Sequence, residues 1–490
     1  IQENVYDSFV KKLKARMHTL RVGDPLDKAM DMGAVVDMTQ KDRIAGYIED
    51  ARTSGADVYQ LPNACPDNGA FIAPTLVCGV QSSDRIVQEE VFGPVATAQS
   101  FRTHDEAVKL ANNTSYGLAA SIWTGSLHKA FEVTPRIKAG IVWINGTNMF
   151  DASVEFGGYK QSGYGREGGQ NGLFAYLKHN SETRLSTADT AAPIHEYDKT
   201  DSGYIDQTPK MYIGGAQKRG DSGYSNPVVS AKGQKIGEVG KGNRKDIRDA
   251  VEAARKAESW SGKTGDNRAQ ILDFVAENLN KRGGEFAERL QKLTGCTAKQ
   301  AQTEVQHSIE ALFLFASLAD KHEGYVHQPP MQAIVPTLNE PVGIIGICCP
   351  NENPLLSFVT LVSAAVSQGN RVVAVPSEKS PLVATDFFQV LDTSDVPAGV
   401  VNIVTGARDE LMDTLSKHEE VDSLWYHGTA EGSSIAEKNA AQSNLKQTWT
   451  NSGKAYDWRT LSTSGARELL RKATQVKSVW VPYGEGTGAK

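Results

Sequence analysis

Apolar residues recur at every fourth position near the start of the chain. A helix is predicted over residues 4–17, where the recurring apolar residues are Val5, Phe9, Leu13 and Met17. Lysines lie between them, so this helix is expected at a surface with its apolar side packed on a sheet. A second helix is predicted over residues 39–54, with Ile44 and Ile48 facing inward.

The second half of the chain alternates apolar runs with helical patterns. Strands are predicted at residues 340–350, 370–376, 397–404 and 422–426. A helix is predicted after the first of these strands, with Pro354 at its start and Gly369 at its end. This alternation predicts an α/β fold with a doubly wound parallel sheet, which binds ligands at the carboxyl ends of its strands.

One stretch before the alternating strands and helices and one after them differ from this pattern. Residues 186–207 are rich in Thr, Ala, Asp, Ser and Gly without periodicity, so they are interpreted as a linker. Near the end, a helix is predicted over residues 466–473 and a strand over residues 477–483. This strand is expected to join a neighbouring sheet, because Trp480 would otherwise lie on an exposed edge. Residues 484–488 are interpreted as a frayed end.

Composition narrows the classes of function. The 490 residues include 52 Lys and Arg against 58 Asp and Glu, for a net charge of −6. This balance argues against nucleic acid or an anionic membrane as the main partner. No apolar run is long enough to span a bilayer. Five cysteines without a Cys-x-x-Cys pair indicate a reducing compartment, taken as the cytoplasm, and ten scattered histidines give no metal site.

The candidate chemistry begins at residues 89–95, which read Glu-Glu-Val-Phe-Gly-Pro-Val. The Gly-Pro pair lets the backbone turn while an aromatic ring is held beside it. In an extended segment Glu90 and Phe92 would share one side, and a carboxylate beside a ring suits a ribose beneath a nicotinamide. The alternative is a buried Phe beside a solvated Glu in an ordinary loop, and for an isolated motif that alternative is the commoner one.

Three later motifs change this balance. They are Asn-Asn-Thr-Ser-Tyr-Gly-Leu-Ala-Ala-Ser at residues 112–121, Gly-Ile-Val-Trp-Ile-Asn-Gly at 140–146, and Phe-Gly-Gly-Tyr-Lys-Gln-Ser-Gly-Tyr-Gly-Arg-Glu at 156–167. In this order they resemble the back half of an aldehyde dehydrogenase catalytic domain. The resemblance implies that Glu90 and Phe92 meet the nicotinamide ribose and ring of NAD or NADP, and that the substrate is a small aldehyde.

The resemblance also assigns a loop at the aldehyde entrance. Asn145, Asn148, Phe150 and Phe156 fall on the loop that lines this entrance in the family. Glu155 stands where many members have Pro, which bears on the shape of the loop. The two phenylalanines could equally be plain core aromatics.

Residues 209–454 resemble the cofactor domain of a second aldehyde dehydrogenase unit, with departures that can be judged chemically. Glu352 replaces the Asn whose amide donates to the oxyanion, and losing such a donor costs about 3 kcal/mol. Val375 replaces the Lys that meets the adenosine ribose, although Glu378 is kept. Thr429 matches the hydroxyl residue at the pyrophosphate. Asn451 lies in Thr-Asn-Ser-Gly-Lys, where the family has Glu-Leu-Gly-Gly-Lys, so the hydrolytic base is absent.

The whole order resembles the double-length members called family sixteen. The predicted domains are the back half of a first family unit at residues 1–185, a linker at 186–207, a degenerate second cofactor-type domain at 208–454, and a helix with an oligomerisation strand at 455–490. No catalytic residue is assigned within the chain. The nucleophilic cysteine is expected before Ile1, so the chain alone is expected to be inactive.

Three functions stay open on this evidence. The first is a portion of an NAD(P)-dependent aldehyde dehydrogenase, expected to be a homodimer, with a non-catalytic second unit. The second is a non-catalytic scaffold or interaction protein built from aldehyde dehydrogenase domains. The third is a permuted subunit assembled from the two halves, which would be inert without the nucleophile.

Overall fold

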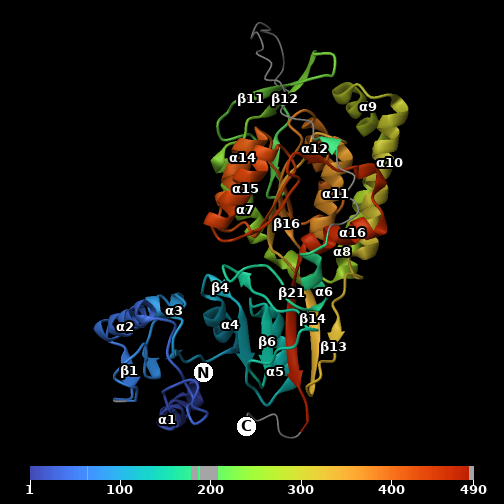
Figure 1. Ribbon diagram of the computed structural model, residues 1–490. Helices are drawn as coiled ribbons and strands as arrows, with labels where there is room; N and C mark the ends of the chain where they lie inside the picture. The colour runs from blue at the N-terminus through green and yellow to red at the C-terminus, as the bar shows by residue number, and fades with distance from the viewer. Residues whose placement is uncertain (63, 178–185, 188–207, 485–490) are drawn as a thin grey trace. The chain divides into compact units, whose positions relative to one another are not determined.

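The structure is a computed structural model that describes residues 1–62, 64–177, 186–187 and 208–484 (Figure 1). Two compact units are present: an N-terminal unit, Ile1–Ala139, and a C-terminal unit, Gly140–Lys490. The predicted linker, apart from residues 186–187, and the predicted frayed end, apart from Gly484, lie outside the described residues. Residues 140–177, which the sequence groups with the first family unit, belong to the C-terminal compact unit.

The N-terminal unit packs short helices around a small sheet. In this sheet β2 (Thr75–Cys78) pairs antiparallel with β1 (Asp57–Gln60) and parallel with β3 (Val95–Ala98). The two predicted helices are confirmed as α1 (Tyr6–Met17) and α2 (Met38–Thr53), the second capped by the Asp37 side chain. The other elements are η1 (Glu3–Val5), α3 (Arg85–Gln88), α4 (His104–Asn112), β4 (Tyr116–Gly117), β5 (Ala119–Ile122), α5 (Leu127–Val133) and η2 (Thr134–Arg136).

The C-terminal unit contains the predicted doubly wound sheet. Its strand order is β10-β9-β17-β16-β15-β18-β19. The four predicted strands appear as β15 (Ile344–Cys348), β16 (Arg371–Val375), β17 (Val401–Ile403) and β18 (Ser423–Tyr426), and all of them pair in parallel. A fifth parallel strand, β19 (Gln447–Thr450), extends the sheet beyond β18.

The expectation of a purely parallel sheet is wrong at one edge. A hairpin of β9 (Met211–Ile213) and β10 (Ala216–Lys218) pairs antiparallel with β17. Gly214 and Gly215 form its turn with φ of 64° and 76°, a backbone region that favours glycine. An antiparallel edge on a parallel sheet gives a mixed α/β sheet.

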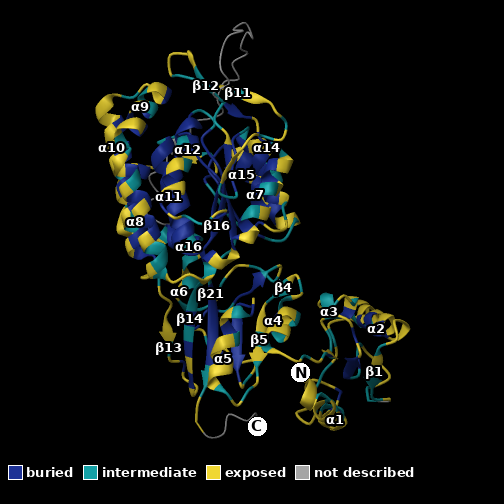
Figure 2. Ribbon diagram, turned by 180° about the vertical axis from the view of Figure 1, so that it is seen from behind, coloured by how far each residue is buried: buried dark blue, intermediate teal, exposed yellow. Residues whose placement is uncertain are grey.

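Helices cover both faces of this sheet (Figure 1). On one face lie α7 (Arg244–Lys256), α14 (Arg408–Lys417) and α15 (Ala430–Gln442), which share one apolar cluster with the strands. On the other lie α8 (Gly265–Lys281), α11 (Pro354–Ser367) and α12 (Leu382–Asp386), which contribute to the largest apolar cluster. The sheet between them is buried, as the dark strand β16 in Figure 2 shows.

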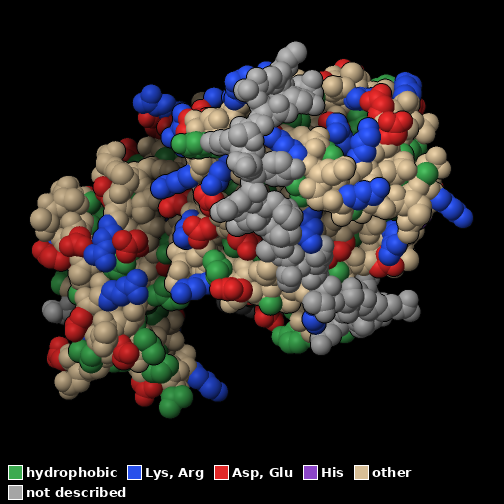
Figure 3. Space-filling model, turned by 90° about the horizontal axis from the view of Figure 1, so that it is seen from above, with side chains coloured by type: hydrophobic (Ala, Val, Ile, Leu, Met, Phe, Trp, Pro, Cys, Tyr) green, Lys and Arg blue, Asp and Glu red, His purple; other side chains and the backbone are tan. Residues whose placement is uncertain are grey.

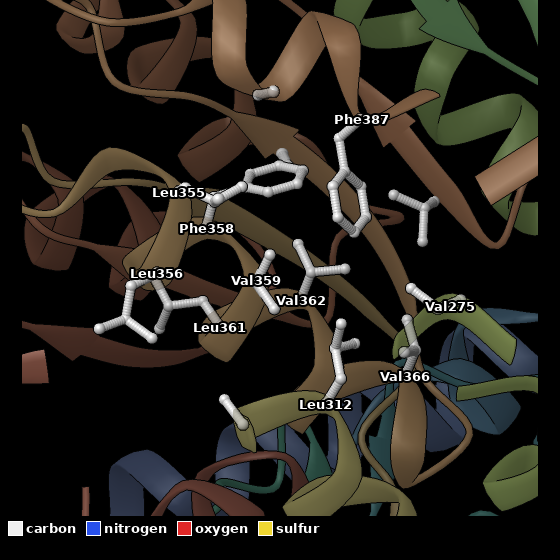
Figure 4. Close-up of a cluster of buried hydrophobic side chains, with 14 of the residues drawn as sticks. Val275, Leu312, Leu355, Leu356, Phe358, Val359, Leu361, Val362, Val366 and Phe387 are labelled. Carbon is white, nitrogen blue, oxygen red and sulfur yellow. The ribbon is translucent and has the colours of Figure 1, made fainter. Parts of the chain in front are cut away.

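Helix α11 is the centre of the larger cluster. All of its residues are buried, and it carries no charged side chain, because helices and sheet surround it. Figure 4 shows its side chains among those of neighbouring elements, and the rings of Phe358 and Phe387 meet edge to face with centroids 5.6 Å apart. Each fully buried Leu, Val or Phe here contributes about 1.5–3 kcal/mol.

The remaining elements of the C-terminal unit complete these layers and the connections. The helical ones are α6 (Gly169–Phe174), η4 (Glu258–Gly262), α9 (Gly283–Thr294), α10 (Ala298–Leu318), α13 (Phe388–Asp392), η5 (Trp458–Thr460) and α16 (Thr463–Lys472). The strands are β7 (Tyr159–Lys160), β8 (Ser186–Thr187), β11 (Ser225–Val229), β12 (Lys235–Gly240), β13 (Val326–His327) and β20 (Lys454–Ala455). Among the described helices, none has both the length and the apolar character needed to cross a bilayer.

A second sheet in this unit is organised by β21 (Thr474–Pro482). The predicted strand at residues 477–483 is confirmed, and it pairs antiparallel with β14 (Ala333–Pro341) and parallel with β6 (Ile141–Ile144). Trp480 is buried there, as expected for a strand inserted into a sheet. Both neighbours of β21 are strands of this chain.

A buried polar network ties β21 to the Gly-Gly-Tyr-Lys segment. The Lys477 ammonium, whose side chain has no exposed surface, lies 2.8 Å from Glu340 Oε1. The Tyr159 hydroxyl donates to Glu340 Oε2 at 2.8 Å, and burial together with the Glu340 charge raises the pKa of Tyr159 well above its ordinary value. Arg166 donates to the Val476 carbonyl through Nε and Nη2, at 3.1 and 2.7 Å. Side chains therefore fix where this segment lies.

An imidazole is enclosed by aromatic rings at the end of β18. His427 lies edge-on to Trp449, Tyr456 and Trp458, with ring centroids 4.6, 5.6 and 5.6 Å away. Neither ring nitrogen has a hydrogen-bond partner among the described residues, so the imidazole is buried among aromatic rings. Burial, helped by the nearby Arg408 charge, lowers the pKa of His427 to about 3.

Charge on the surface is mixed. Figure 3 shows basic and acidic side chains interspersed over the part of that face formed by described residues. Neither sign of charge predominates on the described part of that face.

Glu340→Ala should strongly destabilise the C-terminal unit. It leaves the Lys477 ammonium buried without its carboxylate, which costs about 3–5 kcal/mol. The double variant Glu340→Leu/Lys477→Met removes both charges and should recover most of that loss. Hydrogen exchange of the β21 amides measures both effects, and equal losses in the two variants would contradict a dominant role for the ion pair.

Acid should destabilise the protein through His427. The folded pKa is below the unfolded value of about 6.5, so the stabilisation is complete above pH 6.5 and is lost as the pH falls toward 3. Between pH 6.5 and 5 the loss is about 2 kcal/mol. His427→Leu should reduce this part of the pH dependence in chemical denaturation. An unchanged slope in the variant would assign the effect to other groups, such as His322, whose pKa burial lowers to about 4.

Candidate functional site

The loop after α3 presents Glu90 and Phe92 to solvent. Phe92 is 72% exposed, and no described residue forms a hydrogen bond or ion pair with the Glu90 carboxylate. The alternative of a buried Phe is therefore wrong. The assumption of an extended segment is also wrong, because Phe92 has a φ of 52° and the alternation of sides does not apply.

Contacts with α2 hold this loop in place. Gln40 Nε2 donates to the carbonyl oxygens of Val91 and Phe92, at 3.0 and 3.2 Å. A Cβ at position 93 would lie 2.5 Å from Ile44 Cδ1, so the loop can approach α2 this closely only with glycine. The backbone is thus fixed while the ring of Phe92 stays exposed.

The neighbouring Glu89 has a structural role instead. It accepts from the Tyr47 hydroxyl at 2.6 Å and from Arg85 Nε at 3.1 Å, and these bonds lower the pKa of Glu89. Of the two adjacent glutamates, Glu89 therefore supports the fold and Glu90 is exposed to solvent. The sequence analysis assigned a role only to Glu90, by resemblance to the family, and none to Glu89.

The predicted entrance residues lie on one loop after β6 in the C-terminal unit. The rings of Phe150 and Phe156 are 5.1 Å apart, and Phe150 also meets Trp143 edge to face at 5.9 Å. Asn145 and Asn148 are exposed on the same loop, with φ of 49° and 53°. The structure brings the two rings together, with Phe150 half exposed and Phe156 packed against the apolar cluster of β6 and β21.

Glu155 fixes one end of this loop, a role that the sequence did not predict. Its buried carboxylate accepts from the backbone N–H of Gln170 at 3.1 Å and from Asn171 Nδ2 at 3.0 Å. His327 Nε2 lies 3.0 Å from the other carboxylate oxygen, an ion-pair distance without hydrogen-bond geometry. The only sequence signal was the absence of the family's proline.

Doubly wound folds have their crevice at the switch point of the strand order. In this sheet the switch point lies between β15 and β18, because β15 connects through α11 to β16 on its other side. Such a switch point is where these folds bind dinucleotides, with the pyrophosphate at a helix N-terminus. Here that helix is α15, and its N-cap Thr429 accepts from the Gly432 N–H at 2.9 Å. The Thr429 N–H donates to the Tyr426 hydroxyl at 3.1 Å. Protein oxygens therefore already bind two of the N–H groups at this helix start, those of Thr429 and Gly432.

The Tyr426 side chain fills the space beside two glycines. A Cβ at Gly428 or Gly432 would lie 2.5 Å from Tyr426 Cζ. The hydroxyl donates to Asp409 Oδ1 at 2.6 Å, and burial followed by this bond raises the pKa of Tyr426 to about 12. Gly428 and Gly432 therefore leave room for the ring of Tyr426.

The retained Glu378 is engaged by Arg408, which the sequence did not single out. Glu378 Oε1 accepts from the Arg408 N–H at 2.7 Å, and its other oxygen lies 3.7 Å from Arg408 Nη2. Arg408 is buried, and its Nη1 donates to the carbonyl oxygens of Cys349 and His427 at 3.4 and 3.2 Å. Val375 is fully buried in the apolar cluster of that sheet face.

The last two predicted positions differ in environment. Asn451 is buried and bonds both ways with Gly428, accepting from its N–H at 3.1 Å and donating to its carbonyl at 3.2 Å. It therefore holds the loop after β19 against the loop after β18. Glu352 is partly exposed on the loop between β15 and α11.

Cys65, Cys348 and Cys349 do not have the surroundings of an activated nucleophile, whereas Cys296 is partly exposed in the turn before α10. Cys348 and Cys349 are fully buried and pack in the clusters of opposite sheet faces, as predicted for adjacent strand residues. Burial raises the pKa of both thiols, that of Cys349 to about 12, and also raises the pKa of Cys65. Within the described ranges, no group of three or more His, Cys, Asp or Glu side chains could hold a metal ion.

Comparison with known proteins gives a consistent family. The aldehyde dehydrogenase of Alternaria alternata is 43% identical over 178 residues, 36% of this chain and 36% of that protein. The mitochondrial aldehyde dehydrogenase of Rattus norvegicus is 44% identical over 178 residues, 36% of this chain and 34% of that protein. The chain thus matches about a third of the length of these relatives.

Solved structures and a family model extend the comparison. A betaine aldehyde dehydrogenase from Staphylococcus aureus, solved in complex with NAD+, has 26% identity and a TM-score of 0.48, covering 50% of this chain and 49% of its own. A model described as the aldehyde dehydrogenase family matches residues 1–181 and 219–456. These two segments are most of the sequence, and the chain belongs to the aldehyde dehydrogenase family.

Proposed function

We propose that this chain is a portion of an NAD(P)-dependent aldehyde dehydrogenase that oxidises an aldehyde to a carboxylic acid. The observation that supports this most directly is the exposed carboxylate and ring of Glu90 and Phe92, on a loop that Gln40 and Ile44 hold against α2. Membership of the aldehyde dehydrogenase family supports NAD or NADP as the ligand of Glu90 and Phe92.

The residues of this loop fit the nicotinamide end of the cofactor. Glu90 offers a carboxylate that has no partner among the described residues and can accept hydrogen bonds from ribose hydroxyls, and Phe92 offers a ring face that a flat base can cover. When bound, the cofactor accepts a hydride from the carbon of the substrate. The role of this chain is to bind and orient it, since a fixed loop loses little entropy on binding. Asn145, Asn148, Phe150 and Phe156 are proposed to line the aldehyde entrance.

The nucleophile is proposed to come from outside residues 1–490. A thiolate nucleophile needs an electropositive, accessible environment that lowers its pKa. Four of the five cysteines lack this environment, since Cys348, Cys349 and Cys65 have raised pKa values and Cys78 is buried on β2. The fifth, Cys296, is partly exposed in the turn before α10, away from the position that the family resemblance gives the nucleophile. The chain by itself is therefore proposed to be inactive. The assembly is proposed to be a homodimer in a reducing compartment, taken as the cytoplasm, which suits five free cysteines.

The crevice of the C-terminal unit does not fit a dinucleotide. Tyr426 lies over the glycines, Arg408 engages Glu378, and Val375 is part of the core. Asn451 serves the fold and Glu352 cannot donate to an oxyanion while it is ionised. We assign no step of the reaction to this crevice, and the second family unit is proposed to be non-catalytic, as in family sixteen.

The same observation favours a second candidate function. A crevice filled by the protein's own side chains is what a non-catalytic scaffold built from aldehyde dehydrogenase domains would have. The two functions differ at the N-terminal unit, because only the enzyme requires Glu90 and Phe92 to act on a cofactor.

Glu90→Gln should weaken cofactor binding in the full-length protein that carries these residues. Loss of charge-assisted hydrogen bonds costs about 1.5–3 kcal/mol, which corresponds to a rise in KM for NAD of about 10-fold to 100-fold. Phe92→Ala should lower kcat, because the nicotinamide loses its support. Steady-state kinetics measure both, with Asp7→Asn on the exposed side of α1 as the control. Wild-type kinetics in both variants would contradict the roles given to Glu90 and Phe92, and a full-length protein without NAD-dependent aldehyde oxidation would favour the scaffold.

NAD should not protect the start of α15 in the 490-residue chain. Hydrogen exchange of the Thr429 and Gly432 amides should be the same with and without NAD, because Tyr426 and Thr429 already bind them. Tyr426→Phe removes one acceptor, worth about 1 kcal/mol, and should speed exchange of the Thr429 amide about fivefold. Protection of these amides by NAD in the wild-type chain would show that the crevice binds the cofactor.

A further inference from the structure

The loop after β6 ends at a carboxylate that is closed off from solvent. The Glu155 side chain has no exposed surface. Its Oε1 accepts from the N–H groups of Gln170 and Asn171 at 3.1 and 3.3 Å and from Asn171 Nδ2 at 3.0 Å. This oxygen therefore caps the start of α6, whose N-cap Gly168 has no side chain for that purpose. The other oxygen, Oε2, has no hydrogen-bond partner among the described residues.

The carboxyl group is held firmly on the Oε1 side. A Cβ at Gly169 would lie 2.3 Å from Glu155 Cδ, so α6 can begin this close to the carboxylate only with glycine. The Ser478 hydroxyl on β21 donates to the Glu155 carbonyl oxygen at 2.7 Å. What remains to be balanced is the second oxygen, because a buried carboxylate needs a cation or a donor for its remaining lone pairs.

His327 is the residue that faces Oε2. It lies on β13, the edge strand of the second sheet, next to β14 (Figure 1). Its Nε2 is 3.0 Å from Glu155 Oε2, and its side chain is 16% exposed. Without a proton on Nε2, two lone pairs would face each other at this distance, so the contact requires His327 to carry a proton on Nε2. The ring thus presents its N–H side to a carboxylate that water does not reach.

Arg166 is the other cation near Glu155, but its donors are engaged elsewhere. Its Nε and Nη2 donate to the Val476 carbonyl oxygen, and its Nη1 donates to three carbonyl oxygens of its own segment. Burial lowers the pKa of Arg166, and the Glu155 charge opposes this shift. Among the described residues, His327 is the only one within ion-pair distance of the Glu155 carboxylate.

We propose that His327 is a positioning residue for the aldehyde entrance and acts through Glu155. This inference rests on the proposed function, because it takes the loop that carries Phe150 and Phe156 as the entrance. Phe156 follows Glu155 directly, and its ring lies 5.1 Å from the half-exposed ring of Phe150. A displaced Glu155 would therefore move the aromatic surface that the substrate passes.

The position of His327 in the chain gives this contact a further meaning. His327 belongs to residues 209–454, which resemble the second family unit, whereas Glu155 belongs to the first. A strand of the unit to which no reaction step is assigned thus supports the entrance loop of the other unit. Without His327 the loop would populate other positions, and the aldehyde would bind only the correctly placed fraction.

His327→Phe removes the N–H and keeps a ring. In the full-length protein that carries these residues, it should raise KM for the aldehyde about tenfold, because the entrance is then correctly placed in about a tenth of the molecules. The kcat and the KM for NAD should stay within about twofold, since the chemistry and the cofactor contacts are untouched. His327→Gln offers an amide N–H near the place of Nε2 and should keep KM for the aldehyde within about threefold of the wild-type value. Val326→Thr, at the exposed neighbour on β13, is the matched control and should change none of these constants.

Hydrogen exchange tests the same contact without any activity. In the 490-residue chain, the Phe156 and Gly169 N–H groups donate to the carbonyl oxygens of Glu167 and Ala152 at 2.8 and 3.0 Å. His327→Phe should speed exchange of these two amides about tenfold and leave the amides of β18, in the other sheet, unchanged. The slow exchange should return in the glutamine variant.

The outcomes separate this inference from the proposed function. A higher KM for the aldehyde alone, with faster exchange confined to the loop and recovery in His327→Gln, supports the positioning role. A wild-type KM in His327→Phe overturns it, and so does a matching fall in kcat or rise in KM for NAD, which would show a general loss of stability. If the full-length protein oxidises no aldehyde, the proposed function is wrong. Faster exchange at Phe156 and Gly169 would then still show that His327 positions the loop, and unchanged exchange would overturn that as well.

Discussion

The N–H groups at the start of a helix need acceptors, and this requirement governs the carboxyl edge of the central sheet. In doubly wound folds these groups often bind a ligand anion. Three of the helices that follow strands at that edge have N–H groups bound by acceptors of the protein. Glu304 accepts from α11, Glu378 from the first residue of α14, and Tyr426 with Thr429 from the start of α15. The chain itself therefore binds some of the N–H groups that a nucleotide phosphate could bind.

Arg408 connects the loops at the carboxyl edge of the sheet. Its guanidinium lies within reach of the ends of β15, β16 and β18 through Cys349, Glu378 and His427. A buried cation requires a partner, so Glu378 is needed where it is. The same charge helps to keep His427 neutral inside its aromatic enclosure. The retention of Glu378 thus has a structural reason that does not involve a ribose.

The layout of the fold could be predicted from the sequence, because each strand and helix has a local signal. The apolar runs predicted β15 to β18, and Trp480 predicted that the last strand joins a sheet. The antiparallel hairpin at β9 and β10 was missed, since its strands are only three residues each. Phe92 was placed in an extended segment because no local pattern specifies a left-handed backbone for a bulky residue.

The candidate sites were less predictable for a related reason. The carbonyl and carboxylate partners of Arg408 come from three separate loops, and those of Glu155 from α6 and β13, so only the fold brings them together. The sequence could show that Glu352 and Val375 depart from the family pattern. It could not show that Tyr426 and Arg408 fill the space that a ligand would need.

The two units therefore differ in where their polar groups are directed. In the N-terminal unit, the Gln40 side chain of α2 donates to two backbone carbonyl groups of the loop, and the Glu90 carboxylate has no partner among the described residues. In the C-terminal unit, the Glu304 and Glu378 carboxylates accept from N–H groups at helix starts. Their negative charge makes the carboxyl edge of the sheet less favourable for an anion. A carboxylate at the start of a helix disfavours a bound anion there, so a protein carboxylate and a ligand phosphate are alternatives at these helix starts.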